Sequence, residues 1–219
     1  MKTDKLLLGL TFVALISTPL AGAQEKLGQV HFPVSCSAAA QQEFNRAVAL
    51  LHSFWFDASA KAFAAVTQTD PGCTMGYWGE AMAILFAPNP FAGTPTAKGL
   101  QDGCPAVERA KAAAPKTQRE RDYIGAMESL CQDRDKTDQR TRVMAYGQTM
   151  ERLSRTHPED REAAIFYALA LNITASPADK SYANQLKAAE ILEKVFAEQP
   201  NHPGVAHYLI HSYDYPPIA

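Results

Sequence analysis

Apolar residues recur every three to four positions along most of the chain, which is the spacing of one face of an α-helix. The first such stretch has steps of four, three and four residues, at Phe44, Val48, Leu51 and Trp55. The same spacing resumes after a break near residues 56–57, and runs of β-branched residues are few. The pattern predicts an all-α protein that begins with two antiparallel helices, over about 38–53 and 57–69.

Four prolines each follow an alanine-rich helical stretch, and a proline ends a helix because it lacks a backbone N–H. They are 44, 43 and 42 residues apart, at Pro71, Pro115, Pro158 and Pro200. Such regular spacing is typical of a helical repeat array. The expected hairpins are 38–69, 74–87 with 104–114, 117–131 with 137–156, and 160–174 with 181–198. A further helix is expected to begin at Pro203, which suits the first helical position.

The N-terminal residues have the layout of a secretory signal. Lys2 and Lys5 precede an apolar run over residues 6–16, and Ala21-Gly22-Ala23 fits the cleavage pattern. The run is shorter than the ~20 residues that span a bilayer. We therefore expect residues 1–23 to be a signal peptide and 24–219 to be an exported domain, periplasmic or secreted, without stable membrane insertion. An uncleaved anchor or a buried first helix is the alternative.

The composition indicates which kinds of partner the protein can bind and whether its cysteines are oxidised. The chain has 219 residues, 47% of them hydrophobic and 20% charged, and a formal net charge of −2. This is an ordinary globular mixture, and its charge argues against nucleic acid as a partner. In an exported chain, four cysteines favour two disulfides over four free buried thiols. These are Cys36, Cys73, Cys104 and Cys131.

The proline-closed units resemble the tetratricopeptide repeat (TPR) family, in which small residues lie where the two helices of a hairpin cross. Counted back from Pro71, the small, aromatic and small apolar positions of the second helix hold Ser59, Phe63 and Val66, and Ala47 falls at the small position of the first helix. Counted back from Pro200, Ala188, Leu192 and Val195 match, whereas the unit before Pro158 has the bulky Tyr146, Met150 and Leu153.

The chain looks closer still to one exported bacterial branch of such proteins. The resemblance lies in residues 27–36, 50–55, 70–73 with 77–79, and 202–214. The resemblance implies a right-handed superhelical stack of antiparallel helical hairpins. Proteins of this branch have no assigned reaction. Because members of this branch continue further, and because helix 203–213 lacks a partner helix, we expect the chain to be an N-terminal fragment.

Hairpin geometry selects one pairing of the cysteines. Cys36 lies just before the first helix of the first hairpin and Cys73 just after its second helix, so both lie at the same end. Cys104 begins one helix and Cys131 ends the next antiparallel one. The expected disulfides are therefore Cys36–Cys73 and Cys104–Cys131.

The C-terminal histidines are the strongest candidates for chemistry. His207, His211 and Asp214 lie three and four residues apart, on one face of a helix. Two imidazoles and a carboxylate are ligands for zinc or copper, and His202 and His52 are further candidates. Packing with ordinary hydrogen bonds is the competing interpretation.

An aromatic group is a candidate binding surface. Phe54 and Trp55, with Tyr77 and Trp78, could line a groove for a peptide, although aromatic residues at helical spacing also form cores. The basic stretch over residues 109–121 is interleaved with acidic residues and is typical of a solvated helix face.

Three functions are compatible with these features. The first is a non-catalytic, cofactor-free scaffold that binds a protein or peptide on a concave surface lined by the first helix of each hairpin. The second is a metal-binding protein or metal-dependent enzyme that uses the C-terminal histidines. The third is an assembly adaptor in an envelope complex. GxGxxG, GxxxxGK[ST], GxSxG and HExxH motifs do not occur.

Overall fold

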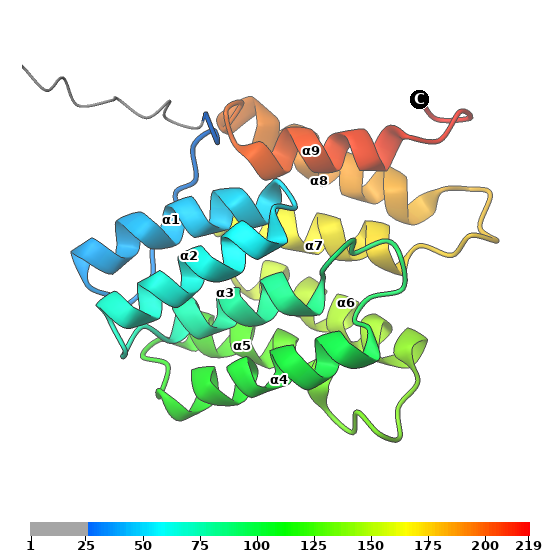
Figure 1. The fold of residues 1–219 in the computed structure, drawn as a ribbon. Helices are drawn as coiled ribbons and strands as arrows, with labels where there is room; N and C mark the ends of the chain where they lie inside the picture. The colour runs from blue at the N-terminus through cyan, green and yellow to red at the C-terminus, as the bar shows by residue number, and fades with distance from the viewer. Residues whose placement is uncertain (1–25) are drawn as a thin grey trace, which may run out of the picture.

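The computed structural model describes residues 26–219, which form nine α-helices and no β-strand (Figure 1). The expected signal peptide, residues 1–23, lies outside the described residues. The helices are α1 (Ala38–His52), α2 (Phe56–Thr69), α3 (Thr74–Leu85), α4 (Ala97–Ala112), α5 (Gln118–Cys131), α6 (Gln139–Thr156), α7 (Arg161–Thr174), α8 (Ala183–Glu198) and α9 (Pro203–Tyr213).

Each helix packs against the next one along the chain, so the all-α class and the succession of paired helices are confirmed. Polar side chains cap most of the N-termini, as the helix signals predict. Thr117 and Glu120 form a reciprocal capping box at the start of α5. Asp138 and Asp160 accept hydrogen bonds from backbone N–H groups in the first turns of α6 and α7.

Helix α4 is the element whose start the sequence places wrongly. We expected residues 104–114, but the helix begins at Ala97, seven residues earlier, and passes through Pro105. Thr96 caps it by accepting from the Gly99 N–H at 2.9 Å. Gly103 brings α4 close to α3, because a Cβ there would lie 2.8 Å from the Leu85 side chain. Gly103 is therefore a packing position between α3 and α4.

The odd-numbered helices also contact one another, in the pairs α1–α3, α3–α5 and α7–α9. In addition α1 contacts α9, which lies beside it in Figure 1. In a simple linear array each repeat touches only its neighbours. The described helices therefore curve back on themselves, and the first one meets the last.

The segment that precedes α1, residues 26–37, is mostly exposed or half-buried but inserts one side chain among the odd-numbered helices. Phe32 is fully buried, and its ring lies 5.4 Å from Phe44, 5.7 Å from Trp78 and 5.1 Å from Tyr123 between ring centroids. The backbone N–H of Ser35 donates to Glu120 of α5 at 2.7 Å. Trp78 is therefore a core residue and not the surface anchor that we considered, because these aromatic rings leave it only 2% exposed.

Both disulfides form the pairs that the hairpin geometry predicts, Cys36–Cys73 and Cys104–Cys131. The first ties the segment before α1 to the α2–α3 connection, and the second ties α4 to the end of α5. Among the described residues, no helix is both long and apolar enough to cross a membrane.

Removal of the Cys104–Cys131 disulfide is expected to destabilise the protein. The two cysteines are 27 residues apart, and cross-linking such a loop restricts the unfolded chain by about 3 kcal/mol. The variant Cys104→Ala/Cys131→Ala should lose about this much free energy of unfolding, measured by urea denaturation. Wild-type protein in which only the Cys104–Cys131 bond has been reduced should lose a similar free energy of unfolding. An unchanged urea midpoint of the double alanine variant would contradict the expectation.

Candidate functional site

A buried polar cluster joins three helices that are distant in sequence. His52 is the last residue of α1, Glu162 lies in the first turn of α7, and His202 precedes α9 as its N-cap residue. The three side chains are at most 3% exposed. Among the described residues they are the one group of three or more potential metal ligands whose donor atoms all lie within 4.8 Å of one another.

Both oxygens of the Glu162 carboxylate are engaged by imidazoles. His52 Nε2 lies 2.9 Å from Oε2, and His202 Nε2 lies 2.8 Å from Oε1. Burial alone would raise the pKa of Glu162, but the two histidines hold it at about 2, so the group is a carboxylate at neutral pH. A carboxylate only accepts hydrogen bonds, so both Nε2 atoms carry the proton and donate it.

Neighbouring side chains fix the His52 ring. Burial lowers the pKa of His52, although Glu162 attracts its proton, so the imidazole is neutral. With the proton on Nε2, Nδ1 accepts from the Tyr208 hydroxyl at 2.9 Å. Phe166 stacks on the ring at 4.7 Å between centroids. The orientation of His52 is thus set by three groups from two other helices.

His202 leaves one polar atom unsatisfied. Its Nδ1 is buried and has no hydrogen-bond partner among the described residues, while its Nε2 is held by Glu162. Buried polar atoms in proteins are hydrogen-bonded in the great majority of cases, and among the described residues His202 Nδ1 shares this exception with the Tyr146 hydroxyl and Asn172 Oδ1. His202 is also the residue of this cluster that lines a cavity between the N-terminal segment and α9.

Gly204 is required by the position of the His52 ring. A Cβ at residue 204 would lie 2.5 Å from His52 Nδ1, inside van der Waals contact. Gly204→Ala should displace the imidazole from Tyr208 and lower the free energy of unfolding by roughly 2 kcal/mol. Gly125→Ala is the matched control on α5, because nothing lies within 4 Å of its added Cβ. The control should be stabilising by up to about 1 kcal/mol, and equal effects of the two variants would refute the argument.

The structure divides the metal-ligand set expected from the sequence. His207 and His211 meet on α9, with their Nε2 atoms 3.1 Å apart. His202 lies instead in the cluster with Glu162, and Asp214 follows the helix as an exposed C-cap residue. His202 does not join the other two histidines because it precedes the helix and points toward Glu162, and Asp214 follows the end of the helix.

A hydrogen bond to the backbone fixes the His207–His211 pair. His207 Nδ1 lies 2.6 Å from the carbonyl oxygen of His52, so Nδ1 carries the proton and donates it. Its Nε2 then accepts from His211 Nε2. Burial and the neighbouring His207 lower the pKa of His211, so the His211 ring is neutral at pH 7. The rings of Phe54 and Phe91 lie against the pair, at 4.3 Å from His207 and 4.5 Å from His211.

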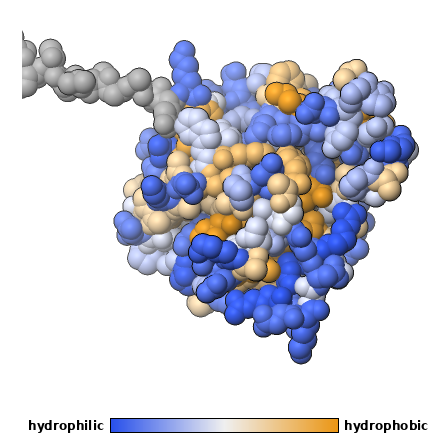
Figure 2. Space-filling model, turned by 45° about the vertical axis from the view of Figure 1, so that its right-hand side comes forward, coloured by the Kyte–Doolittle hydropathy of each residue, from blue (hydrophilic) through white to orange (hydrophobic). Residues whose placement is uncertain are grey.

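The aromatic residues proposed as a binding surface separate into different environments. Phe54 is half-buried against Phe56, and Trp55 is 50% exposed. Tyr77 is half-buried with the guanidinium of Arg109 over its ring. Figure 2 shows hydrophobic residues gathered near the middle of one face, with hydrophilic residues around them. The four aromatic residues do not form one groove, because helical spacing turns Trp78 into the core.

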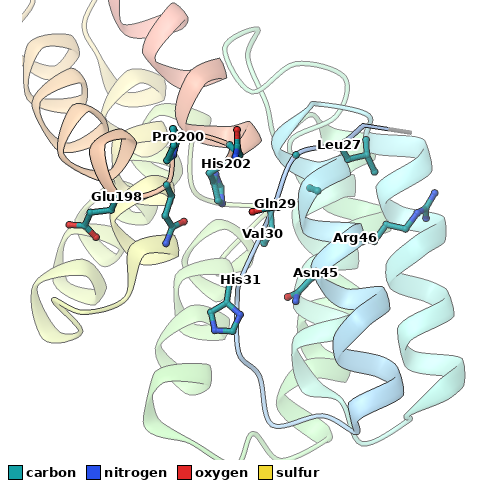
Figure 3. Close-up of a pocket in the computed structure, with 13 residues that line it drawn as sticks. Leu27, Gln29, Val30, His31, Asn45, Arg46, Glu198, Pro200 and His202 are labelled. Atoms are coloured by element: carbon teal, nitrogen blue, oxygen red, sulfur yellow. The ribbon is translucent and has the colours of Figure 1, made fainter. Parts of the chain in front are cut away.

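A cavity of about 930 Å³ lies between the N-terminal segment, α1 and the α8–α9 connection. Its walls include Gln29, Asn45 and His202, and Figure 3 shows Arg46 and Glu198 on opposite sides. The segment is held in place where the Gln29 N–H donates to the Asn201 carbonyl at 3.0 Å. Gly28 has a φ of +78°, and a Cβ there would lie 2.5 Å from the same carbonyl oxygen.

Comparison with known proteins finds no matching family model, no matching curated protein and no matching solved structure. The candidate residues therefore rest on the geometry alone. Sequence reasoning identified His52 and His202 but missed Glu162. Glutamate is common in the first turn of a helix because it interacts favourably with the helix dipole. The position of Glu162 in the sequence therefore did not mark it as a site residue.

Proposed function

We propose that the chain is an exported, non-catalytic tetratricopeptide-repeat scaffold that binds a segment of a partner protein. The observation that carries the binding role is the cavity between the N-terminal segment and the α8–α9 connection. One wall is a stretch of extended chain with polar backbone groups, and the other walls offer both charged and apolar side chains. Such a lining suits a polypeptide segment better than a purely apolar ligand.

Helix packing supports the TPR-like part of the proposal. Ser59 and Ala47, the small positions of the first hairpin, are both fully buried, and the Ser59 hydroxyl donates to the Ala47 carbonyl at 3.0 Å. Gly79 of α3 packs against the Phe63 ring, where a Cβ would lie 2.1 Å away. These close approaches are what small residues at helix crossings permit. The proposed arrangement is a right-handed stack whose two ends are in contact.

The two disulfides support export, because such bonds persist in oxidising compartments such as the periplasm or the cell exterior. The proposed partner site differs from the open concave groove that repeat proteins commonly use. Here residues 30–35 cover that surface, since Phe32 and Ser35 contact helices α1, α3 and α5. The cavity beside this segment is the proposed site instead.

A random peptide library displayed on phage tests this function with the protein as bait. The proposal expects enrichment of a consensus peptide that Gln29→Trp, which fills the cavity, weakens by roughly tenfold or more, equivalent to about 1.4 kcal/mol. Gln101→Trp is the matched control, because Gln101 is exposed on α4 and away from the cavity. Failure to enrich any peptide, or equal binding by both variants, would overturn the proposal.

The second candidate function is metal binding, and the cluster of His52, Glu162 and His202 favours it. This site differs from the C-terminal set expected from the sequence. Metal binding at this cluster does not depend on partner binding.

A further inference from the structure

The donor atoms of His52, Glu162 and His202 are spaced like ligands of one ion. Zinc binds imidazole nitrogen and carboxylate oxygen at about 2.0–2.2 Å, so two of its ligands lie roughly 3 Å apart. The two nitrogen–oxygen distances in the cluster are 2.9 and 2.8 Å. Both imidazoles direct Nε2 toward the carboxylate, which offers an oxygen to each.

Side chains outside the cluster also hold the His52 imidazole in place. The Tyr208 hydroxyl holds His52 Nδ1, Phe166 stacks on the ring, and Gly204 leaves room for it. A partner on the second ring nitrogen is the usual support of a metal-ligating histidine. Glu162 is buried, and its two oxygens face the Nε2 atoms of His52 and His202, so a cation between these atoms would compensate the charge of the carboxylate.

We propose that His52, Glu162 and His202 form a zinc site that joins α1, α7 and α9. Two imidazoles and one carboxylate are a borderline donor set, which favours zinc over calcium or magnesium. The site is enclosed, so its role is to hold the first and last described helices together. His207 and His211 do not join it, because their Nε2 atoms are paired with each other.

Zinc binding at this site has a defined proton balance. Each ring has one proton, on Nε2, and that proton moves to Nδ1 when Nε2 becomes a zinc ligand, so neither ring loses a proton overall. At His52 the proton on Nδ1 is then donated to the Tyr208 oxygen, and the hydrogen bond between these two atoms reverses its direction. His202 Nδ1 also becomes a donor, at the wall of the large cavity.

The test uses protein purified without a histidine tag and freed of metal with a chelator. Zinc is titrated in competition with a chromophoric chelator. The proposal expects one tightly bound zinc per chain. Absence of zinc binding by the folded wild type would overturn it.

Variants locate the site within the chain. Glu162→Gln and His202→Gln should each weaken zinc binding by at least roughly 100-fold, since even loss of a supporting residue costs 10- to 100-fold. His207→Ala/His211→Ala should bind zinc as the wild type does. The opposite pattern would place the ion on α9 and refute the proposal. Far-UV circular dichroism shows whether each variant is folded, and the zinc stoichiometry of the wild type stands whether or not a variant folds.

Discussion

Glu162→Leu is expected to lower the free energy of unfolding by roughly 4 kcal/mol, measured in the presence of chelator. The carboxylate accepts from His52 and His202, both buried, and leucine offers neither N–H an acceptor. Each buried donor left unpaired costs about 1–3 kcal/mol, and removing one member of a buried charged group costs about 3–5 kcal/mol. The expected loss is therefore large even without metal.

Urea denaturation followed by tryptophan fluorescence provides the measurement, because Trp78 is buried and unfolding exposes it. Glu159→Leu is the matched control. Glu159 is exposed just before α7, so its replacement should change the urea midpoint little. Glu162→Gln retains the shape of the side chain and one acceptor oxygen, and it should fall between the wild type and Glu162→Leu. Equal stability of the two leucine variants would show that the cluster contributes nothing to the fold.

Arg142→Met is the second large effect, with an expected loss of roughly 3 kcal/mol. Arg142 is 2% exposed, and its guanidinium donates to four backbone carbonyls around the α5–α6 connection. The acceptors, at 2.7–3.1 Å, are the carbonyl oxygens of Leu130, Gln132, Arg134 and Thr137. Methionine fills similar space without donors, so the buried carbonyls lose their partners.

The cation also faces the carboxyl end of α5, where the helix dipole is negative and a positive charge stabilises it. Thermal unfolding compared with Arg152→Met gives the control, since Arg152 lies on the same helix and is exposed. Hydrogen exchange should show faster exchange over residues 130–138 in Arg142→Met. A variant with wild-type stability and unchanged exchange would contradict this role for Arg142.

Local features of the sequence were sufficient to predict most of the helices. Proline stops and N-cap residues act on the backbone within one turn, so Pro71 and Thr117 mark element ends without knowledge of the fold. Hairpin geometry likewise predicted both disulfides. The start of α4 was missed because Gly103 packs against Leu85 of α3, a contact between helices that the local sequence does not reveal.

The candidate site could be predicted only in part, because its members meet through long-range packing. His52 and Glu162 are 110 residues apart, and His52 and Tyr208 are 156 residues apart. A pattern of three or four residues along α9 relates His207 to His211 but carries no information about α1 or α7. Arg142 was missed for a different reason. Its partners lie within 12 residues of it, but they belong to an irregular connection whose backbone course has no sequence pattern.

The contact between α1 and α9 has a consequence for how the chain folds. An array of repeats that touch only their neighbours can fold from one end, each unit completing the one before it. Here the His52 side chain is not buried until residues 202–208 pack against it, because His202 and Tyr208 contact its ring. Contacts of such wide separation slow folding. The first hairpin is therefore synthesised first but reaches its final packing last. That packing is complete only after nearly all of the described residues have been made.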